Sequence, residues 1–290
     1  MELDKFFEKI PIDKVYEDLF QPGMKKAGEA LATVIDAGNL LLLPIKLMNE
    51  KSRMYLQDNL KRYQEKLQKE ETKKVIKVPE HVGLPIIDKL TYLNQKELSE
   101  AFINLLTKAS FEETIHLVHP SFANILNNLS ADEAKILFYL KDEHKVLFID
   151  IHVDRGRSYN KKSKILSGSR AGEEIEYQAI DSATYRIARY LTGLEESVAI
   201  DFPENIPLYL ENLEHNGLIK IDKGYLREDE DSYKALEETY QQRKEEAHDF
   251  AKKMREEDNQ YLFHDCVKRG YFEFTEIGQS FIRACITDIQ

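Results

Sequence analysis

The sequence predicts a mainly α protein with an N-terminal helical region, a central three-helix unit and a C-terminal winged-helix-like α+β unit that carries a charged helical insertion. Three observations predict this fold class. Apolar residues recur at helical spacing from residue 27 to residue 140. A helix, a glycine and two short strand-like runs follow near the end of the chain. Charged residues make up 32% of the chain, above the usual quarter or so, which suits long solvated helices.

The central helices have the clearest local signals. An apolar face at i, i+3, i+4, i+7, i+8 and i+11 runs from Leu98 to Ala109 and predicts one helix. A second helix is expected to open at Pro120, because proline suits the first helical position. A third is expected to start at Ser130, which forms a capping-box pattern with Glu133.

The N-terminal region is predicted to be helical with one break. A helix from Pro22 keeps apolar spacing over five turns, and Pro44 is expected to kink or stop it. A polar helix is expected from Lys46 to about Lys74. Residues 74–85 contain two prolines and a glycine and are interpreted as a linker. The polar helix carries a narrow apolar stripe, typical of contact with one partner helix, formed by Leu56, Leu60, Tyr63 and Leu67.

The C-terminal region predicts the winged-helix-like unit. Residues 145–153 are β-branched and aromatic and predict a strand, whereas 179–191 are interpreted as a helix. Residues 203–215 predict a helix that Gly217 ends in the left-handed conformation. Strands are expected at 218–221 and 271–274, and Thr275 is expected to cap a last helix. The charged insertion would span about 229–264.

Composition and charge set the domain division and the compartment. The predicted parts are residues 1–78, 79–128 and 129–290. Two cysteines give no disulfide framework, and the first ten residues lack the pattern of a signal peptide, so a cytoplasmic setting is expected. The net charge is −11, and residues 201–290 hold 12 basic against 21 acidic residues, so that end would repel a polyanion.

Several motifs together resemble a known family. They are AFINLLTKAS, HPSF and LSADEAKIL in the centre, residues 15–46 before them, and YLENLEHNGLIKI and GYFEFTEIGQSFIRACI after them. Their order and spacing resemble the bacterial abortive infection alpha (Abi-alpha) family. The resemblance implies a role in phage defence and supplies no catalytic residues. Its central motif, expected to be structural, consists of His119, Pro120, Ser121 and Phe122.

The sequence predicts no catalytic residue, metal site or cofactor. His116 and His119 have helical ligand spacing, but a helix end explains them better. The run from His264 to Cys266 contains nucleophile and ligand chemistry without a recognisable oxyanion hole or base. Dinucleotide, phosphate-loop and zinc-protease motifs do not occur in the sequence. An enzymatic function is therefore not expected, although the sequence does not decide it.

The segment from Leu31 to Met48, LATVIDAGNLLLLPIKLM, is the sharpest functional lead. Asp36, Asn39 and Lys46 interrupt it, which argues against a constitutive transmembrane helix. It can be the core helix of the N-terminal region, an oligomer interface, or a helix that meets a membrane after a trigger. The contact residues would be Leu31, Val34, Ile35, Leu40, Leu41, Leu42, Leu43, Ile45 and Leu47.

A basic stretch, residues 155–170, is the second lead. Basic residues with an interleaved aromatic can bind RNA or anionic lipid, although a solvated loop is the simpler interpretation. The residues that would contact a polyanion are Arg155, Arg157, Lys161, Lys162, Lys164 and Arg170.

The functional prediction follows from these leads. We expect a phage-defence protein that acts through protein contacts, as a homo-oligomer, and through membrane disruption after a trigger. It would be cytoplasmic or peripheral to the inner membrane. The alternative is a nucleic-acid-binding or regulatory module that uses residues 155–170, although nucleic acid is the less favoured partner. No small-molecule substrate is identified.

Overall fold

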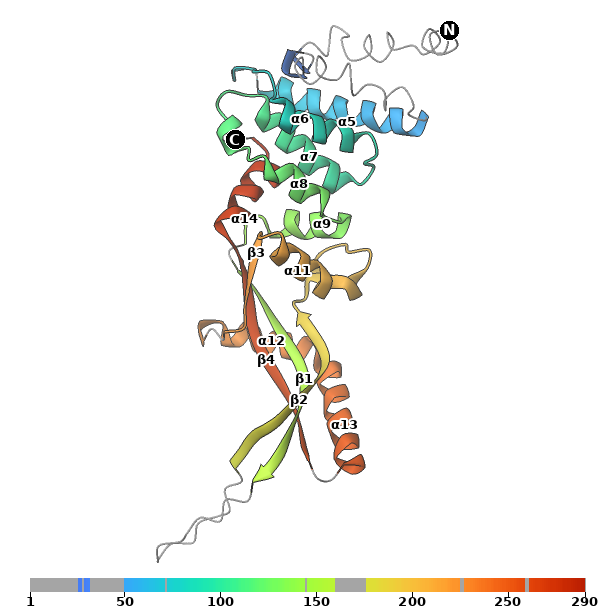
Figure 1. Cartoon of the computed structure of the whole chain (residues 1–290), viewed down its shortest axis with the longest axis vertical. Helices are drawn as coiled ribbons and strands as arrows, with labels where there is room; N and C mark the ends of the chain where they lie inside the picture. The colour runs from blue at the N-terminus through green and yellow to red at the C-terminus, as the bar shows by residue number, and fades with distance from the viewer. Residues whose placement is uncertain are drawn as a thin grey trace, which may run out of the picture. The chain divides into compact units, whose positions relative to one another are not determined.

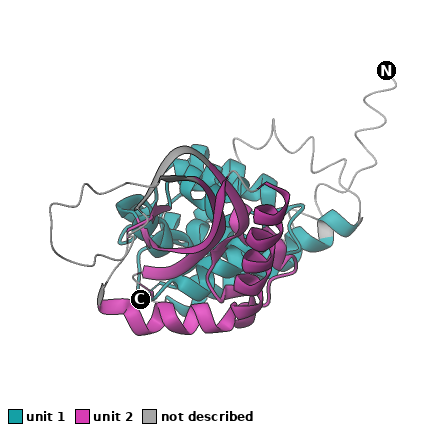
Figure 2. Cartoon of the chain, turned by 90° about the horizontal axis from the view of Figure 1, so that it is seen from below, with its two compact units in different colours: residues 1–142, 209–218, 275–290 teal, residues 143–208, 219–274 magenta. Residues whose placement is uncertain are grey.

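The chain folds as an α+β protein with two compact units. The computed structural model describes residues 26–27, 29–31, 50–70, 72–143, 145–159, 176–224, 227–258 and 261–289. Unit 1 comprises residues 1–142, 209–218 and 275–290, and unit 2 comprises residues 143–208 and 219–274. Figure 1 labels the helices and strands, and Figure 2 colours the two units. The three-part division at residues 78 and 128 stays a prediction.

Unit 1 is helical, and its central helix is α7. This helix is buried along most of its length and packs against α5, α6, α8, α9 and the C-terminal π-helical turn η5. The described elements of the unit are α5 (Glu50–Lys69), α6 (Glu80–Leu90), α7 (Lys96–Ala109), η2 (Ile115–Leu117), α8 (Ser121–Asn127), α9 (Ala131–Leu140), most of α11 (Ile206–His215), α14 (Glu276–Phe281) and η5 (Ile282–Ile286).

The three central helices confirm the local signals in the sequence. Pro120 precedes the first residue of α8, as its fixed φ favours. The Ser130 hydroxyl oxygen accepts a hydrogen bond from the Glu133 backbone N–H, and the Glu133 carboxylate accepts one from the Ser130 N–H. This capping box satisfies donors that the first turn of α9 would otherwise leave unpaired.

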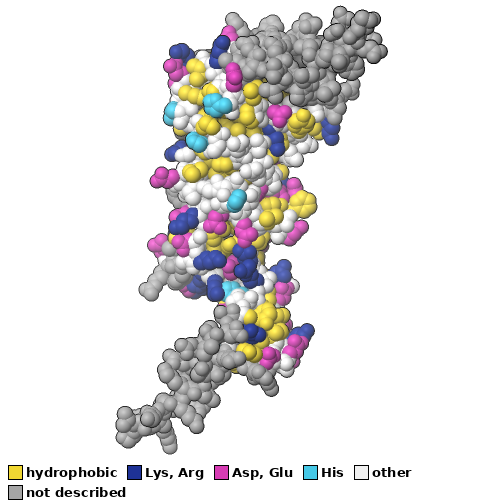
Figure 3. All heavy atoms as spheres, viewed as in Figure 1, with side chains coloured by type: hydrophobic (Ala, Val, Ile, Leu, Met, Phe, Trp, Pro, Cys, Tyr) yellow, Lys and Arg dark blue, Asp and Glu magenta, His cyan; other side chains and the backbone are white. Residues whose placement is uncertain are grey.

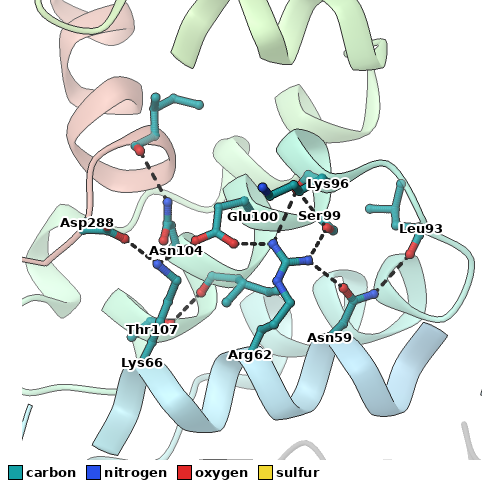
Figure 4. A network of polar contacts seen from close by, with 12 residues as sticks. Asn59, Arg62, Lys66, Leu93, Lys96, Ser99, Glu100, Asn104, Thr107 and Asp288 are labelled. Carbon is teal, nitrogen blue, oxygen red and sulfur yellow. Dashed lines mark hydrogen bonds and ion pairs between the residues drawn. The ribbon is translucent and has the colours of Figure 1, made fainter. Parts of the chain in front are cut away.

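Helix α5 confirms the predicted stripe. Leu56, Leu60, Tyr63 and Leu67 are all buried, and the Tyr63 hydroxyl lies 2.6 Å from the Ser110 Oγ. Beside the stripe, a polar network joins α5 to α7 (Figure 4). Arg62 contacts Ser99 and Glu100 in this network. Apolar packing and hydrogen bonds together therefore hold α5 on α7.

Helix α6 corrects the prediction of a linker over residues 74–85. The segment contains a helix from Glu80 that includes Pro85. Its apolar side chains Val82, Ile86 and Leu90 are four residues apart and buried. Burial of this stripe offsets the backbone hydrogen bond that a proline inside a helix removes.

Unit 2 is built on an antiparallel sheet in the order β2-β1-β4-β3. The strands are β1 (Lys145–Tyr159), β2 (Glu176–Leu191), β3 (Ile219–Asp222) and β4 (Leu262–Phe274). The other described elements are α10 (Leu194–Ser197), η3 (Pro203–Asn205), η4 (Arg227–Asp229), α12 (Glu230–Thr239) and α13 (Gln241–Glu257). The longest strands, β1, β2 and β4, account for most of the strand pairing.

The prediction of a helix over residues 179–191 is wrong, because these residues form most of β2. β2 pairs with β1, and the register shifts near Ile151 and His152. Such an irregularity interrupts the two-residue alternation of a strand, so a sequence window around it does not show a strand period. Tertiary pairing with β1 decides the conformation.

The mainly α, winged-helix-like fold class is also wrong. The expected order of α11, Gly217, β3, β4 and α14 does occur. However, β4 pairs with β1 along nearly its whole length and with β3 only near its end. The two C-terminal strands therefore belong to one four-stranded sheet. A two-stranded wing is therefore absent from this arrangement.

The charged insertion is helical, as predicted, and covers one face of the sheet. α12 and α13 lie between β3 and β4 in the chain. The cluster they form with the sheet excludes water from Ile149, Ile151, Val153, Tyr233, Ala247, Ala251 and Phe263. Within the described residues, no helix is long and apolar enough to cross a membrane.

Candidate functional site

The face of the sheet opposite the α12–α13 cluster carries polar side chains beside the buried ring of Phe148. Successive side chains of a strand point to opposite faces. Ile149, Ile151 and Val153 of β1 pack in the apolar cluster, so His152 and Asp154 lie on the other face. Figure 3 shows basic and acidic side chains and a histidine gathered over β1 and β4. The sheet thus has an apolar cluster on one face and ionisable side chains on the other.

Three of these groups come together across β1 and β4. His152 is paired in register with Cys266, and Asp154 lies two residues further along the same face of β1. One donor atom from each of the three side chains lies within 4.8 Å of the others. The Cys266 thiol is 3.5 Å from the Asp154 Oδ2, and the Thr184 hydroxyl donates a 2.7 Å hydrogen bond to the Asp154 Oδ1. We call His152, Asp154 and Cys266 the β1–β4 triplet.

The surroundings of the triplet shift the pKa of each of its three side chains. Burial and the positive charge of Lys268 lower the pKa of His152, which favours a neutral imidazole. Burial and the nearby Asp154 carboxylate raise the pKa of the Cys266 thiol to about 11. Burial opposes ionisation of Asp154, but hydrogen bonds from Thr184 and Cys266 outweigh it and lower that pKa. At neutral pH the triplet is therefore an imidazole, a carboxylate and a thiol.

The triplet could not be predicted from the sequence. His264, Asp265 and Cys266 are neighbours in the sequence, but alternation along β4 places Asp265 on the face opposite to His264 and Cys266. The Asp265 Oδ1 lies 3.3 Å from the Nδ1 of His248 on α13. Cys266 instead contacts Asp154 on the opposite face of the sheet. Asp154 and Cys266 are 112 residues apart in the chain. The one available signal was the His-x-Asp alternation in a predicted strand, and it does not reveal the partner strand.

A groove of about 610 Å³ lies beside β2 in the same unit. Its wall includes Tyr240, whose hydroxyl accepts a 2.8 Å hydrogen bond from the Gly193 N–H and donates one to Glu195. Burial, followed by the Glu195 carboxylate, raises the pKa of Tyr240. Arg186, Arg189 and Arg243 border the groove among apolar residues of β2.

The central motif at residues 119–122 lies at the start of α8 in unit 1. The His119 Nδ1 lies 2.6 Å from the Ser121 Oγ and accepts a 3.2 Å hydrogen bond from the Ser121 N–H. The Phe122 ring meets Phe281 edge-on, with centroids 5.5 Å apart. These contacts organise the start of α8 and attach it to α14. His116 and His119 do not form a metal-ligand cluster within the described part of the chain.

Most residues of the two sequence leads lie outside the described residues. Of segment 31–48, only Leu31 is described, and it is buried together with Ala27 and Ala30. Of the basic stretch, Arg155 and Arg157 lie on β1, and the Arg155 guanidinium stacks over the Tyr261 ring at 4.6 Å. The remaining contact residues outside the description are Val34, Ile35, Leu40, Leu41, Leu42, Leu43, Ile45, Leu47, Lys161, Lys162, Lys164 and Arg170.

Together these features define an α+β protein with a helical unit and a sheet unit that carries a histidine, aspartate and cysteine triplet. The chain belongs to the abortive infection alpha family, whose profile matches residues 55–285 and so confirms the resemblance of the central and C-terminal motifs. Membership of this family implies a role in phage defence.

Comparison with solved structures adds no functional argument. An uncharacterized protein from the hydrocarbon-degrading marine bacterium Alcanivorax borkumensis SK2 is similar at 17% sequence identity with a TM-score of 0.29. The similarity covers 57% of this chain and 92% of that protein. No curated protein matches the chain significantly.

Proposed function

We propose that this protein is a phage-defence effector that acts by contact with other macromolecules and uses segment 31–48 as its contact element. The observation that carries the proposal is the apolar composition of this segment in a chain of the abortive infection alpha family. Abortive infection requires an effector that harms the infected host, and breaching a membrane needs no active site. A homo-oligomer interface is the other contact that this segment suits.

The length of the segment supports the membrane form of the proposal. Eighteen helical residues span about 27 Å at a rise of about 1.5 Å each, close to the roughly 30 Å hydrocarbon core of a bilayer. The charges of Asp36 and Lys46 make permanent insertion unfavourable. A segment of this kind is suited to enter a bilayer, or to lie on it, only after a trigger.

The residues just before segment 31–48 are attached to unit 1 by hydrogen bonds, which supports a state in which the segment is retained on the protein until a trigger. The Ala27 N–H donates a 3.0 Å hydrogen bond to the Gln64 Oε1 of α5. The Ala30 carbonyl accepts a 2.8 Å hydrogen bond from the Val78 N–H, and Leu31 is 3% exposed. The chain therefore enters segment 31–48 from a point attached to unit 1.

The test is uptake of a membrane-impermeant dye by phage-challenged cells that express the protein. We expect dye entry before normal lysis, and its loss in the double variant Leu41→Asp/Leu42→Asp. The control is Leu208→Asp/Ile277→Asp, which adds the same charges at exposed apolar positions of unit 2 and unit 1. Circular dichroism and thermal unfolding establish that each variant is folded.

Three other outcomes separate the alternatives. Protection without early dye entry would contradict membrane disruption, and light scattering would then test whether the variant loses an oligomer. Full protection and an unchanged oligomeric state in the folded Leu41→Asp/Leu42→Asp variant would contradict segment 31–48 as a contact element. Unfolding of this variant alone would assign the segment to the core.

A second candidate function is polyanion binding by the basic residues of 155–170. The pairing of β1 with β2 extends as far as Tyr159 and Glu176. Residues 160–175 therefore connect the ends of two antiparallel strands. Salt-dependent retention on a polyanion column tests this candidate. Lys161→Glu/Lys162→Glu/Lys164→Glu should elute at lower salt, whereas Lys234→Glu/Lys252→Glu/Lys253→Glu, at exposed sites of α12 and α13, is the charge-matched control. Equal elution of the two variants would contradict a specific role of the basic stretch.

A further inference from the structure

We infer that the β1–β4 triplet of His152, Asp154 and Cys266 binds a divalent transition-metal ion, with zinc as the best-fitting ion. The three side chains offer a nitrogen, an oxygen and a sulfur ligand, a set that zinc accepts in proteins. Binding of the ion displaces the Cys266 thiol proton to solvent, and the resulting imidazole and thiolate ligands favour zinc and similar ions over magnesium or calcium, which prefer oxygen. The inference concerns a site that the proposed contact function does not use.

The positions of the donor atoms agree with a shared ion. With bonds of about 2.3 Å to sulfur and 2.1 Å to oxygen, tetrahedral zinc separates these two ligands by roughly 3.6 Å. The Cys266 Sγ and the Asp154 Oδ2 are already 3.5 Å apart. All three donor atoms lie within 4.8 Å of one another, so closing them around an ion requires side-chain adjustment of about 1 Å.

The imidazole of His152 points independently to a ligand. Its side chain is buried, with 5% of the residue exposed, and its Nε2 has no hydrogen-bond partner among the described residues. An unsatisfied buried polar atom costs about 1–3 kcal/mol, so such atoms are uncommon in folded proteins. Coordination of the ring by a metal ion would explain why a histidine is kept on this strand.

The carboxylate of Asp154 is held for coordination. The Thr184 hydroxyl on β2 donates to the Oδ1, and this leaves the Oδ2 toward Cys266. Hydrogen bonds that orient a ligand in this way are a regular feature of metal sites. The register supports the same arrangement, because Thr184 and Asp154 are paired across β1 and β2, and His152 and Cys266 across β1 and β4. Three adjacent strands therefore fix the site.

The triplet supplies three ligands, which leaves a fourth tetrahedral position. Zinc sites with three protein ligands usually hold a water or an exchangeable ligand there, whereas structural sites close with four. The charges around His152 are mixed, since Asp150 and Asp154 are negative and Lys268 and Arg186 are positive. Because the triplet supplies only three ligands, the ion that fits is a divalent transition metal with one exchangeable ligand.

The test uses full-length protein without a histidine tag, stripped of metal by a chelator. Zinc is titrated in competition with a chromophoric chelator, and cobalt is used to read out thiolate ligation by absorption. We expect one ion per chain and a thiolate-to-cobalt charge-transfer band. Cys266→Ser should abolish the band and weaken zinc binding at least tenfold, and Thr184→Ala should weaken it by about 10–100-fold, the usual effect of losing a ligand-orienting partner.

The chain offers a matched control in its second cysteine. Cys285 is buried in unit 1, and Cys285→Ala should retain both the band and the zinc affinity. His116→Ala/His119→Ala controls for the other histidine pair and should bind zinc normally. Circular dichroism checks each fold, and Asp154→Asn and Thr184→Ala carry the test if Cys266→Ser does not fold.

Three results would overturn the inference. They are folded protein that binds no zinc above the level of a tag-free unrelated protein, a cobalt band that survives Cys266→Ser, and binding lost only in the Cys285 or His116/His119 variants. Because the measurement is metal binding by purified protein, its outcome is independent of dye uptake and of phage protection.

Discussion

The phenolic oxygen of Tyr233 lies 3.1 Å from the carbonyl oxygen of Gly270, and its hydroxyl donates a buried hydrogen bond that attaches α12 to β4. The Arg269 guanidinium lies 5.4 Å from the centre of the same ring and pairs with Glu230 and Glu237 of α12. These contacts join the charged insertion to the sheet. The insertion is therefore part of the core of unit 2 and not an appendage.

Removal of this hydroxyl is expected to destabilise the protein. Tyr233→Phe leaves the Gly270 carbonyl without its buried donor and should lower the free energy of unfolding by about 1–2 kcal/mol. Urea denaturation monitored by circular dichroism measures this change. Tyr139→Phe, at a half-exposed position of α9, should leave stability unchanged. Equal midpoints for all three proteins would show that the bond does not stabilise the fold.

Gly270 is expected to tolerate no side chain. A Cβ at this position would lie 2.4 Å from the Phe148 Cζ and 2.7 Å from the Asp222 carbonyl oxygen, so packing must shift. We expect Gly270→Ala to lower the free energy of unfolding by about 1–3 kcal/mol, as overpacking usually does. Gly156→Ala is the matched strand control, because no atom beyond the adjacent residues would lie within 4 Å of an added Cβ. Stability of Gly270→Ala at or above that of Gly156→Ala would contradict this packing.

The capping box of α9 gives a local prediction. Ser130→Ala removes the acceptor for the Glu133 N–H and should cost about 1 kcal/mol. Thermal unfolding followed by calorimetry detects such a loss. Ser232→Ala, at an exposed position inside α12, should be neutral or slightly stabilising because alanine favours helices. Similar melting temperatures for Ser130→Ala and the unmodified protein would show that the cap contributes little.

The buried Lys108 predicts a pH dependence of stability. Burial lowers its pKa from 10.5 to about 8, while the Thr287 carbonyl accepts its hydrogen bond. Between these values the unfolded chain binds more protons than the folded chain, so stability rises with pH. The gain from pH 8 to pH 10 should be about 2 kcal/mol, since one pKa unit corresponds to about 1.4 kcal/mol.

Lys108→Met separates this effect from other titrations. The variant should be more stable at pH 7, because no charge is buried, and its stability should rise less between pH 8 and pH 10. Urea denaturation at a series of pH values gives both slopes. The same rise in the variant and in the unmodified protein would assign the pH dependence to other groups.

Much of unit 1 could be predicted from the sequence because its signals are local. Leu98 to Ala109 repeat at helical spacing, Ser130 and Glu133 form a cap, and Gly217 adopts φ +72° after α11. Each signal is contained within a few residues of one helix. The stripe of α5 followed from the same reasoning, since its apolar residues require burial wherever the partner lies.

The sequence by itself determined the central helices, their caps and the motifs that identify the family. Only the tertiary structure decided that residues 176–191 form β2, that 80–90 form a helix despite Pro85, and that Asp154 meets Cys266. The physical reason is the distance along the chain between the residues that interact. A cap or an apolar stripe depends on neighbours within a few residues, whereas β2 depends on its register with β1, and the β1–β4 triplet depends on register between segments more than a hundred residues apart.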